Sequence, residues 1–167
     1  RAALEAGAAG AVAGTRFLLS EESRAHPAYK QRLAGAEETV LTDLFGAGWP
    51  APHRVVPNVA TERWLGRRSS FLRIYRSKDE RRGILRAPGA NRILNQLLAP
   101  GARYVPPALQ LRMVRAQRPG SRLLTPAAPT DDAPGTLIDA GALYAGETVA
   151  RIREVRPAAR IVRDLAF

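Results

Sequence analysis

Residues 10–19 read GAVAGTRFLL, a short apolar run that contains two glycines. A run of this length bounded by glycine is typical of a buried strand in a parallel sheet. The preceding residues 1–9, RAALEAGAA, are mostly good helix formers, and Gly7 favours a helix stop. A helix, a glycine and a buried strand in this order are typical of the repeating unit of an α/β fold.

Gly14 and Thr15 stand where this strand would end and the chain would turn toward a helix. Bare glycine lets backbone N–H groups approach an anion closely, and a threonine hydroxyl adds one more donor. In β/α barrels the loops after the last two strands are the usual phosphate site. Taken alone, such a pair more often forms a plain turn, and a phosphate contact is the alternative.

The rest of the chain predicts short elements separated by turns. Ser20, followed by two glutamates, predicts the start of a helix, and Pro27 predicts a second helix that runs to about Leu33. Residues 68–122 hold several proline and glycine turn signals, at Pro100-Gly101 among others, and favour no regular pattern. The further elements that we expect are a strand at 37–45, an extended piece at 53–57, a helix from Thr61 as cap to Arg67, a loop at 123–136, a helix from Leu137 to about Val155, and a last amphipathic helix that opens at Pro157 with Ile161, Val162 and Leu165 on its apolar face.

The composition narrows the classes of function. The chain has 26 basic and 15 acidic side chains and a net charge of +11. No apolar run approaches the roughly 18 residues that span a bilayer, so we expect no membrane segment and a cytoplasmic protein. The absence of cysteine excludes disulfides and thiolate metal sites. Two histidines, His26 and His53, are too few for a zinc site or a histidine-based triad, and we interpret both as structural or solvated residues.

Three stretches of the sequence resemble the nitronate monooxygenase family, once called 2-nitropropane dioxygenases. They are ALEAGAAGAVAGTRFL with SEES and AHPAYKQ within 2–31, TVLTDLFGAGWPAPHRVVPN at 39–58, and LYAGETVARIREVRPAARIVRDL at 143–165. Members of that family are FMN-dependent β/α barrels. The resemblance therefore implies an α/β fold, the C-terminal fragment of a TIM-type (β/α)8 barrel plus a smaller mixed helical and strand region.

The resemblance also implies a division of the chain. Residues 1–36 would form the end of the FMN-binding barrel, with its last strand and following helices. Residues 37–136 would form an inserted or lid-like region, in which 68–118 are divergent and basic. Residues 137–167 would form C-terminal helices that return to the barrel. Because the chain begins with Arg1 and not with Met, we expect a fragment that lacks the N-terminal part.

Two family motifs fall on this sequence. The first reads Gln, any residue, Gly, Thr and holds the phosphate end of FMN; Val12 replaces its Gln. The second reads Ala-Gly-Gln near the flavin, and Glu147 replaces its Gln, which would place a charge beside the cofactor. The residues that the resemblance assigns to FMN are Val12, Ala13, Gly14, Thr15, Gly146 and Glu147.

The family's catalytic histidine lies upstream, on a segment that this chain does not contain, so we expect no catalytic residue here. Tyr144, beside the second motif, would line the mouth of the active site or serve only in packing.

The activity implied by the resemblance is FMN-dependent oxidation of alkyl nitronates with molecular oxygen. In such chemistry the flavin does the redox work, and the protein supplies binding and orientation. We expect the isolated 167-residue chain to be inactive and not to hold FMN. A flavin-dependent enoyl reductase of the same superfamily, whose end motif also reads Ala-Gly-Gln, is the nearest alternative.

A basic segment offers an alternative of another class. Residues 62–92 hold ten basic side chains against three acidic ones, with Phe71 and Tyr75 between them. This pattern suits non-specific binding of nucleic acid, but we favour a solvated insertion outside the barrel as its explanation. No recognised nucleic-acid motif frames the cluster, so we do not expect nucleic acid among the partners. We predict that 68–118 lie away from Gly14 and Thr15. Clustered guanidinium groups are costly to bury without partners, so we expect solvent exposure for most of Arg67, Arg68, Arg73, Arg76, Arg81, Arg82 and Arg86.

Overall fold

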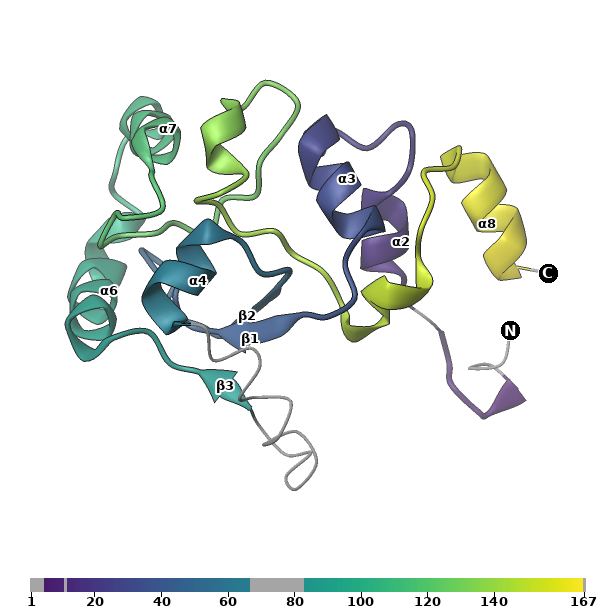
Figure 1. The fold of residues 1–167 in the computed structure, drawn as a ribbon, viewed down its shortest axis with the longest axis horizontal. Helices are drawn as coiled ribbons and strands as arrows, with labels where there is room; N and C mark the ends of the chain where they lie inside the picture. Colours follow the sequence, from purple (N-terminus) through teal and green to yellow (C-terminus); the bar gives the residue numbers. More distant parts are fainter. Residues whose placement is uncertain (1–4, 11, 67–82, 167) are drawn as a thin grey trace.

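A computed structural model of the protein describes residues 5–10, 12–66 and 83–166. It contains short helices around a small sheet (Figure 1). In chain order the elements are α2 (Gly14–Leu18), α3 (Pro27–Ala34), β1 (Val40–Thr42), β2 (His53–Val55), α4 (Val59–Leu65), β3 (Ile84–Leu85), α6 (Gly89–Ala102), α7 (Pro107–Ala116), the 3-10 helices η1 (Gly135–Leu137) and η2 (Glu147–Arg151), and α8 (Ala158–Ala166).

The sheet has three strands in the order β2-β1-β3. β1 and β2 run antiparallel with Val40 opposite Val55, and β1 and β3 run parallel with Leu41 opposite Ile84. β1 and β2 lie within the stretches where the sequence predicts a strand and an extended piece. The fold is therefore mixed α/β, as expected at the level of class, whereas the assignment to the end of a barrel stays a prediction.

The strand predicted at 10–19 is wrong for the described residues of that stretch. Gly10, Val12 and Ala13 have no regular secondary structure, and α2 begins at Gly14. Val12 is fully exposed. A buried parallel strand needs hydrogen-bonding partners for its backbone, and no strand in the described part of the chain pairs with these residues.

The helix predicted at Ser20 is also wrong. Ser20 forms a parallel bridge with Arg156, so its backbone is used between segments and not within a helix. The next prediction is confirmed, because α3 begins at Pro27 and ends one residue after Leu33. The imidazole Nδ1 of His26 caps this helix by accepting a hydrogen bond of 3.1 Å from the Ala28 N–H.

α4 is capped by Asn58 and not by Thr61, the cap predicted from the sequence. The Asn58 carboxamide oxygen accepts from the Thr61 N–H at 3.2 Å, and the Asn58 N–H donates to the Thr61 hydroxyl at 2.7 Å. The side-chain nitrogen Nδ2 of Asn58 also donates to the backbone carbonyls of Ile138 and Gly141 at 3.0 and 2.9 Å. This buried side chain therefore both starts α4 and ties it to a distant segment.

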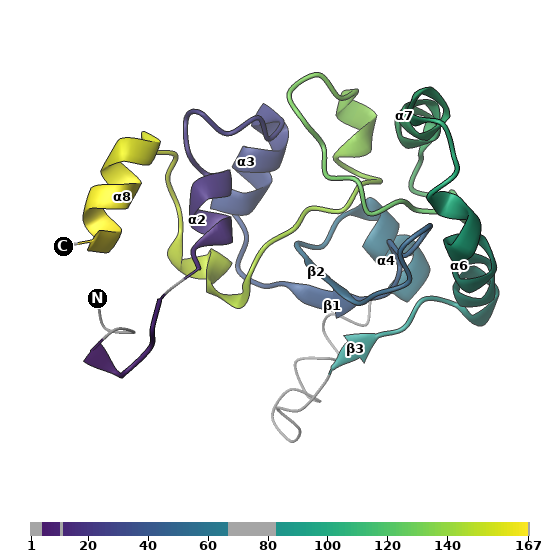
Figure 2. The same cartoon turned by 180° about the vertical axis from the view of Figure 1, so that it is seen from behind.

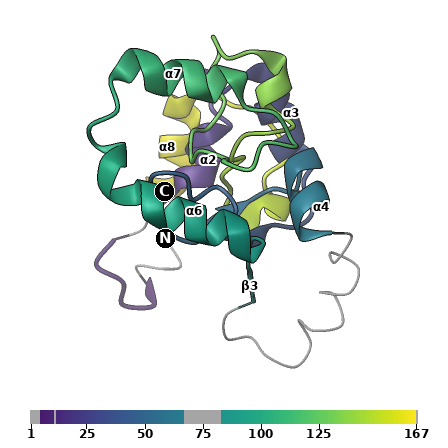
Figure 3. The ribbon, with the colours of Figure 1, turned by 90° about the vertical axis from the view of Figure 1, so that its left-hand side faces the viewer.

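α6 and α7 form within the stretch where the sequence favours no regular pattern. The turn predicted at Pro100-Gly101 is wrong, because both residues lie inside α6. A proline there removes one backbone hydrogen bond near the end of a helix that is otherwise satisfied. Pro106 and Pro107 begin α7, where the fixed φ of proline suits the first turn. Figure 3 shows α6 and α7 in front, on the side of the molecule that faces the viewer.

The helix predicted from Leu137 to Val155 is wrong. Only η1 and η2 are helical in that range, and the residues between them run along β2. The Val56 N–H donates to the Leu143 carbonyl at 2.8 Å, and the Ala145 N–H donates to the Arg54 carbonyl at 3.2 Å. Pairing with another segment thus replaces the intrahelical hydrogen bonds. The last helix is confirmed, since α8 follows Pro157 directly.

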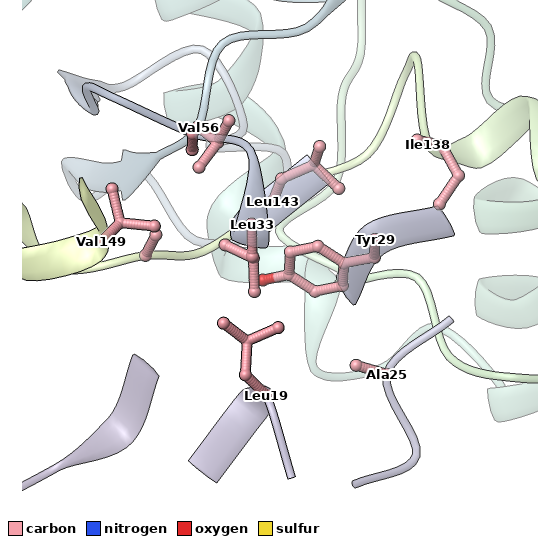
Figure 4. Close-up of a cluster of buried hydrophobic side chains, with 10 residues drawn as sticks. Leu19, Ala25, Tyr29, Leu33, Val56, Ile138, Leu143 and Val149 are labelled. Atoms are coloured by element: carbon pink, nitrogen blue, oxygen red, sulfur yellow. The ribbon is translucent and has the colours of Figure 1, made fainter. Parts of the chain in front are cut away.

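Two buried clusters form the core. The Tyr29 cluster comprises Leu19, Ala25, Tyr29, Leu33, Ala36, Val56, Ile138, Leu143, Ala145 and Val149 (Figure 4). The Phe45 cluster comprises Leu44, Phe45, Val55, Ala60, Ala87, Leu124 and Ala142. Figure 2 shows α2, α3 and α8 at one end of the molecule and α6 and α7 at the other, with the sheet between them. Ile161 of α8 is buried, whereas Val162 and Leu165 on its predicted apolar face are about half exposed.

Candidate functional site

Thr15 and Gly146 lie 131 residues apart in the sequence and are joined by a hydrogen bond. The Gly146 N–H donates to the Thr15 hydroxyl oxygen at 2.8 Å. A Cβ atom added to Gly146 would lie 3.3 Å from that oxygen, so the approach is close. The structure therefore brings together the two segments that the family resemblance assigns separately to the flavin.

The other residues of the first motif lie apart from this contact. Val12 and Gly14 are exposed, and Ala13 is half-buried. A Cβ atom added to Gly14 would meet no atom within 4 Å. The expected position of Gly14 and Thr15 at the end of a buried strand is therefore wrong in the described structure, because both residues belong to α2.

Glu147, the departure from the second motif, is paired with Arg54 of β2. The Arg54 Nη2 atom lies 2.8 Å from the Glu147 Oε1 atom, with the carboxylate about two-thirds exposed. The negative charge expected beside the cofactor is therefore compensated by a guanidinium group. This ion pair is not predictable from the sequence, because Arg54 and Glu147 belong to different stretches of the family resemblance.

Arg16 follows Thr15 in α2 and contacts a different segment. Its Nη1 atom donates to the backbone carbonyl of Glu154 at 2.7 Å. Its Nη2 atom is buried and has no hydrogen-bond partner among the described residues. A buried guanidinium N–H without an acceptor is costly, so this atom requires an acceptor beyond the described residues.

An apolar groove of about 980 Å³ lies between α6, α7 and the loops at 47–53 and 123–127. We name it the α6–α7 groove. His53 and Tyr144 meet at it, with the Tyr144 hydroxyl 3.1 Å from the His53 Nδ1 atom. The hydroxyl also donates to the Pro126 carbonyl at 2.9 Å. Burial lowers the pKa of His53 and raises the pKa of Tyr144.

A family model described as nitronate monooxygenase matches residues 1–167. The chain belongs to the nitronate monooxygenase family. The prediction of this family from three separate stretches is confirmed, and the match also runs through 68–118, where the sequence shows little resemblance. No curated protein and no solved structure matches the chain.

Membership of the nitronate monooxygenase family makes this protein an oxidoreductase of a flavin-dependent superfamily. The Thr15 hydroxyl fits the phosphate end of a flavin nucleotide. The Thr15 oxygen accepts from Gly146, and none of the described residues takes the hydroxyl proton, which leaves it free for an anion. The buried Nη2 atom of Arg16 is a second donor without a described acceptor.

The basic stretch of this nitronate monooxygenase family member is only partly described. Arg86 is more than half exposed, as predicted, but it forms an ion pair at 3.2 Å with the buried Asp43, which Arg92 approaches at 3.3 Å. Asp43 also accepts a hydrogen bond from the Ala87 N–H at 2.6 Å. The sequence does not mark Asp43 as a buried acceptor. The predictions for Arg67, Arg68, Arg73, Arg76, Arg81 and Arg82 lie outside the described residues. Within 5–10, 12–66 and 83–166, no helix has the length and apolar character to cross a membrane.

Proposed function

We propose that this protein binds FMN through its phosphate and, with this cofactor, oxidises alkyl nitronates with molecular oxygen. The observation that carries the proposal is the hydrogen bond between Gly146 and Thr15, which joins the two flavin motifs of the family. The two motifs lie in separate stretches of the sequence, 131 residues apart. Family membership supports the flavin, and the local donor groups support a phosphate.

Each residue at this contact has a separate role. The Gly146 N–H donates a hydrogen bond to the Thr15 hydroxyl oxygen. The hydroxyl proton of Thr15 therefore points away from Gly146 and toward a ligand. Arg16 contributes a charged N–H, and charge-assisted hydrogen bonds to phosphate are about twice as strong as neutral ones. Arg54 compensates the charge of Glu147, which would otherwise repel the phosphate. When bound, FMN would supply the redox chemistry, while these side chains bind and orient it.

The test compares Thr15→Val with Thr15→Ser in the intact protein. Valine keeps the branched shape and loses the hydroxyl, whereas serine keeps the hydroxyl. We expect Thr15→Val to weaken FMN binding roughly 10- to 100-fold, the usual value of a hydrogen bond to a charged group, and Thr15→Ser to stay near wild type. Equal FMN affinity in Thr15→Val and wild type, measured by titration of flavin fluorescence, would remove the phosphate role.

The reaction itself is tested on the FMN-loaded intact protein. Oxygen uptake with ethyl nitronate is the expected activity. Reduction of an enoyl thioester by a reduced nicotinamide, without nitronate-dependent oxygen uptake, would replace the proposal by the enoyl reductase alternative. FMN titration and substrate turnover thus test the cofactor and the substrate separately.

A further inference from the structure

We propose that the α6–α7 groove binds a neutral, largely apolar small molecule. The site is distinct from the flavin contact at Thr15 and Gly146, and it does not depend on the cofactor. Its volume of about 980 Å³ lies at the upper end of the range of about 300–1,000 Å³ that is usual for ligand pockets.

The walls of the groove come from segments that are far apart in the sequence. Leu97 of α6 and Met113 of α7 line it, as do Trp49 of the 47–53 loop and Leu123. Leu97 is 72% exposed and Trp49 is 66% exposed, although both are large apolar side chains. Apolar surface gathered in a concave site is characteristic of a place where an apolar ligand is bound.

The charge of the lining restricts the ligand. The chain has 26 basic residues, yet no lysine, arginine, aspartate or glutamate lines the α6–α7 groove in the described structure. A charged ligand would lose its hydration there and find no opposite charge in return. The favoured ligand is therefore neutral along its whole buried length.

His53 and Tyr144, two polar side chains that line the groove, already have hydrogen-bond partners within the protein. The Tyr144 hydroxyl lies 2.9 Å from the Pro126 carbonyl oxygen and 3.1 Å from the His53 Nδ1 atom. The His53 Nε2 atom lies 3.4 Å from the carbonyl oxygen of Trp49, to which the Nε2–H tautomer donates. The ligand therefore needs no charged group to satisfy these side chains.

The net charge of the protein argues against a second copy of the chain as the occupant. At +11, two copies of the chain repel one another. The chemistry that fits is a neutral alkyl or aryl body.

The test is a titration of the intact protein with N-phenyl-1-naphthylamine, a neutral apolar fluorescent probe that carries one N–H. We expect saturable binding, with Trp49 fluorescence changing in step. 1-Decanol should displace the probe, and decanoate of equal chain length should be weaker by about tenfold or more, because its carboxylate finds no partner in the groove. Equal displacement by decanol and decanoate would contradict a site for neutral ligands.

Matched variants place a charge inside or outside the groove. Met113→Glu and Leu97→Glu should weaken probe binding by about tenfold or more. Leu111→Glu and Ile93→Glu change exposed leucine and isoleucine side chains of the same two helices that do not line the groove, and they should leave binding unchanged. A thermal melt checks folding, and the two helices give independent readings. Equal losses in all four variants, or probe release as the protein dimerises at high concentration, would overturn the proposal.

Discussion

The hydroxyl of Tyr29 donates a hydrogen bond of 2.7 Å to the backbone carbonyl of Tyr144. Tyr29 is fully buried, and its burial raises the pKa of its hydroxyl, so the group remains a donor throughout the physiological range. Two residues after Tyr144, Gly146 meets Thr15. A core tyrosine of α3 therefore fixes the segment that serves both the α6–α7 groove and the flavin contact.

Removal of this hydroxyl should destabilise the protein. Tyr29→Phe leaves the Tyr144 carbonyl without its donor in a half-buried place, and we expect a loss of about 1–3 kcal/mol in the free energy of unfolding. Denaturant titration measures it. Tyr104→Phe is the control, because Tyr104 is 72% exposed and should change stability little. A Tyr29→Phe variant as stable as Tyr104→Phe would show that the hydrogen bond contributes nothing.

Asn58 should be one of the most sensitive polar positions. Asn58→Ala removes the cap of α4 and the donors to Ile138 and Gly141, so we expect a loss of about 2–4 kcal/mol in unfolding free energy. Asn58→Asp keeps the capping oxygen but cannot donate to either carbonyl. If Asn58→Asp retains wild-type stability in a thermal melt, the tie to the second segment is unimportant and only the cap matters.

Acid should destabilise the protein through His53. Burial lowers the pKa of His53 below its ordinary value of 6.5, an effect that the Trp49 carbonyl partly offsets. The unfolded chain therefore binds more protons than the folded one in the interval below 6.5, and the free energy of unfolding falls as the pH falls through it. His53→Gln, which does not titrate, should have a flatter profile between about pH 7.5 and pH 5.5. Parallel profiles for the two proteins would contradict this assignment.

Gly48 should tolerate no side chain. Its φ is +80°, and an added Cβ would lie 2.9 Å from the Cβ of Ala102 at the end of α6. We expect Gly48→Ala to cost about 1–3 kcal/mol in unfolding free energy. Gly101→Ala, one residue before Ala102, meets no atom within 4 Å and should be neutral or more stable by up to about 1 kcal/mol. Similar melting temperatures for the two variants would show that the loop at Gly48 can move away.

Local signals in the sequence predicted the elements that local forces determine. Pro27 and Pro157 mark real helix starts, because a proline in the first turn acts within its own segment. The predicted strand at 10–19 and the helix from Leu137 failed for the opposite reason. The hydrogen bonds of their backbones depend on partners elsewhere in the chain. The residues around Leu143, for example, form hydrogen bonds with the β2 segment.

The candidate sites show the same contrast between local sequence signals and contacts made by distant residues. The family resemblance located Thr15 and Gly146 without revealing that they touch. His53 and Tyr144 were each noticed in the sequence, but nothing joined them, since 91 residues separate the two. Arg54 and Asp43 escaped notice because a single arginine or aspartate in a charged chain carries no signal of its partner.

The segment Ala142 to Ala145 alternates between the two buried clusters. Leu143 and Ala145 belong to the Tyr29 cluster, Ala142 belongs to the Phe45 cluster, and Tyr144 packs against the latter. Neither cluster can open without disturbing the backbone of this segment, so the two halves should unfold as one cooperative unit. In native-state hydrogen exchange, the amides of Val56 and Ala145 should share a single opening free energy with those of α3 and α4.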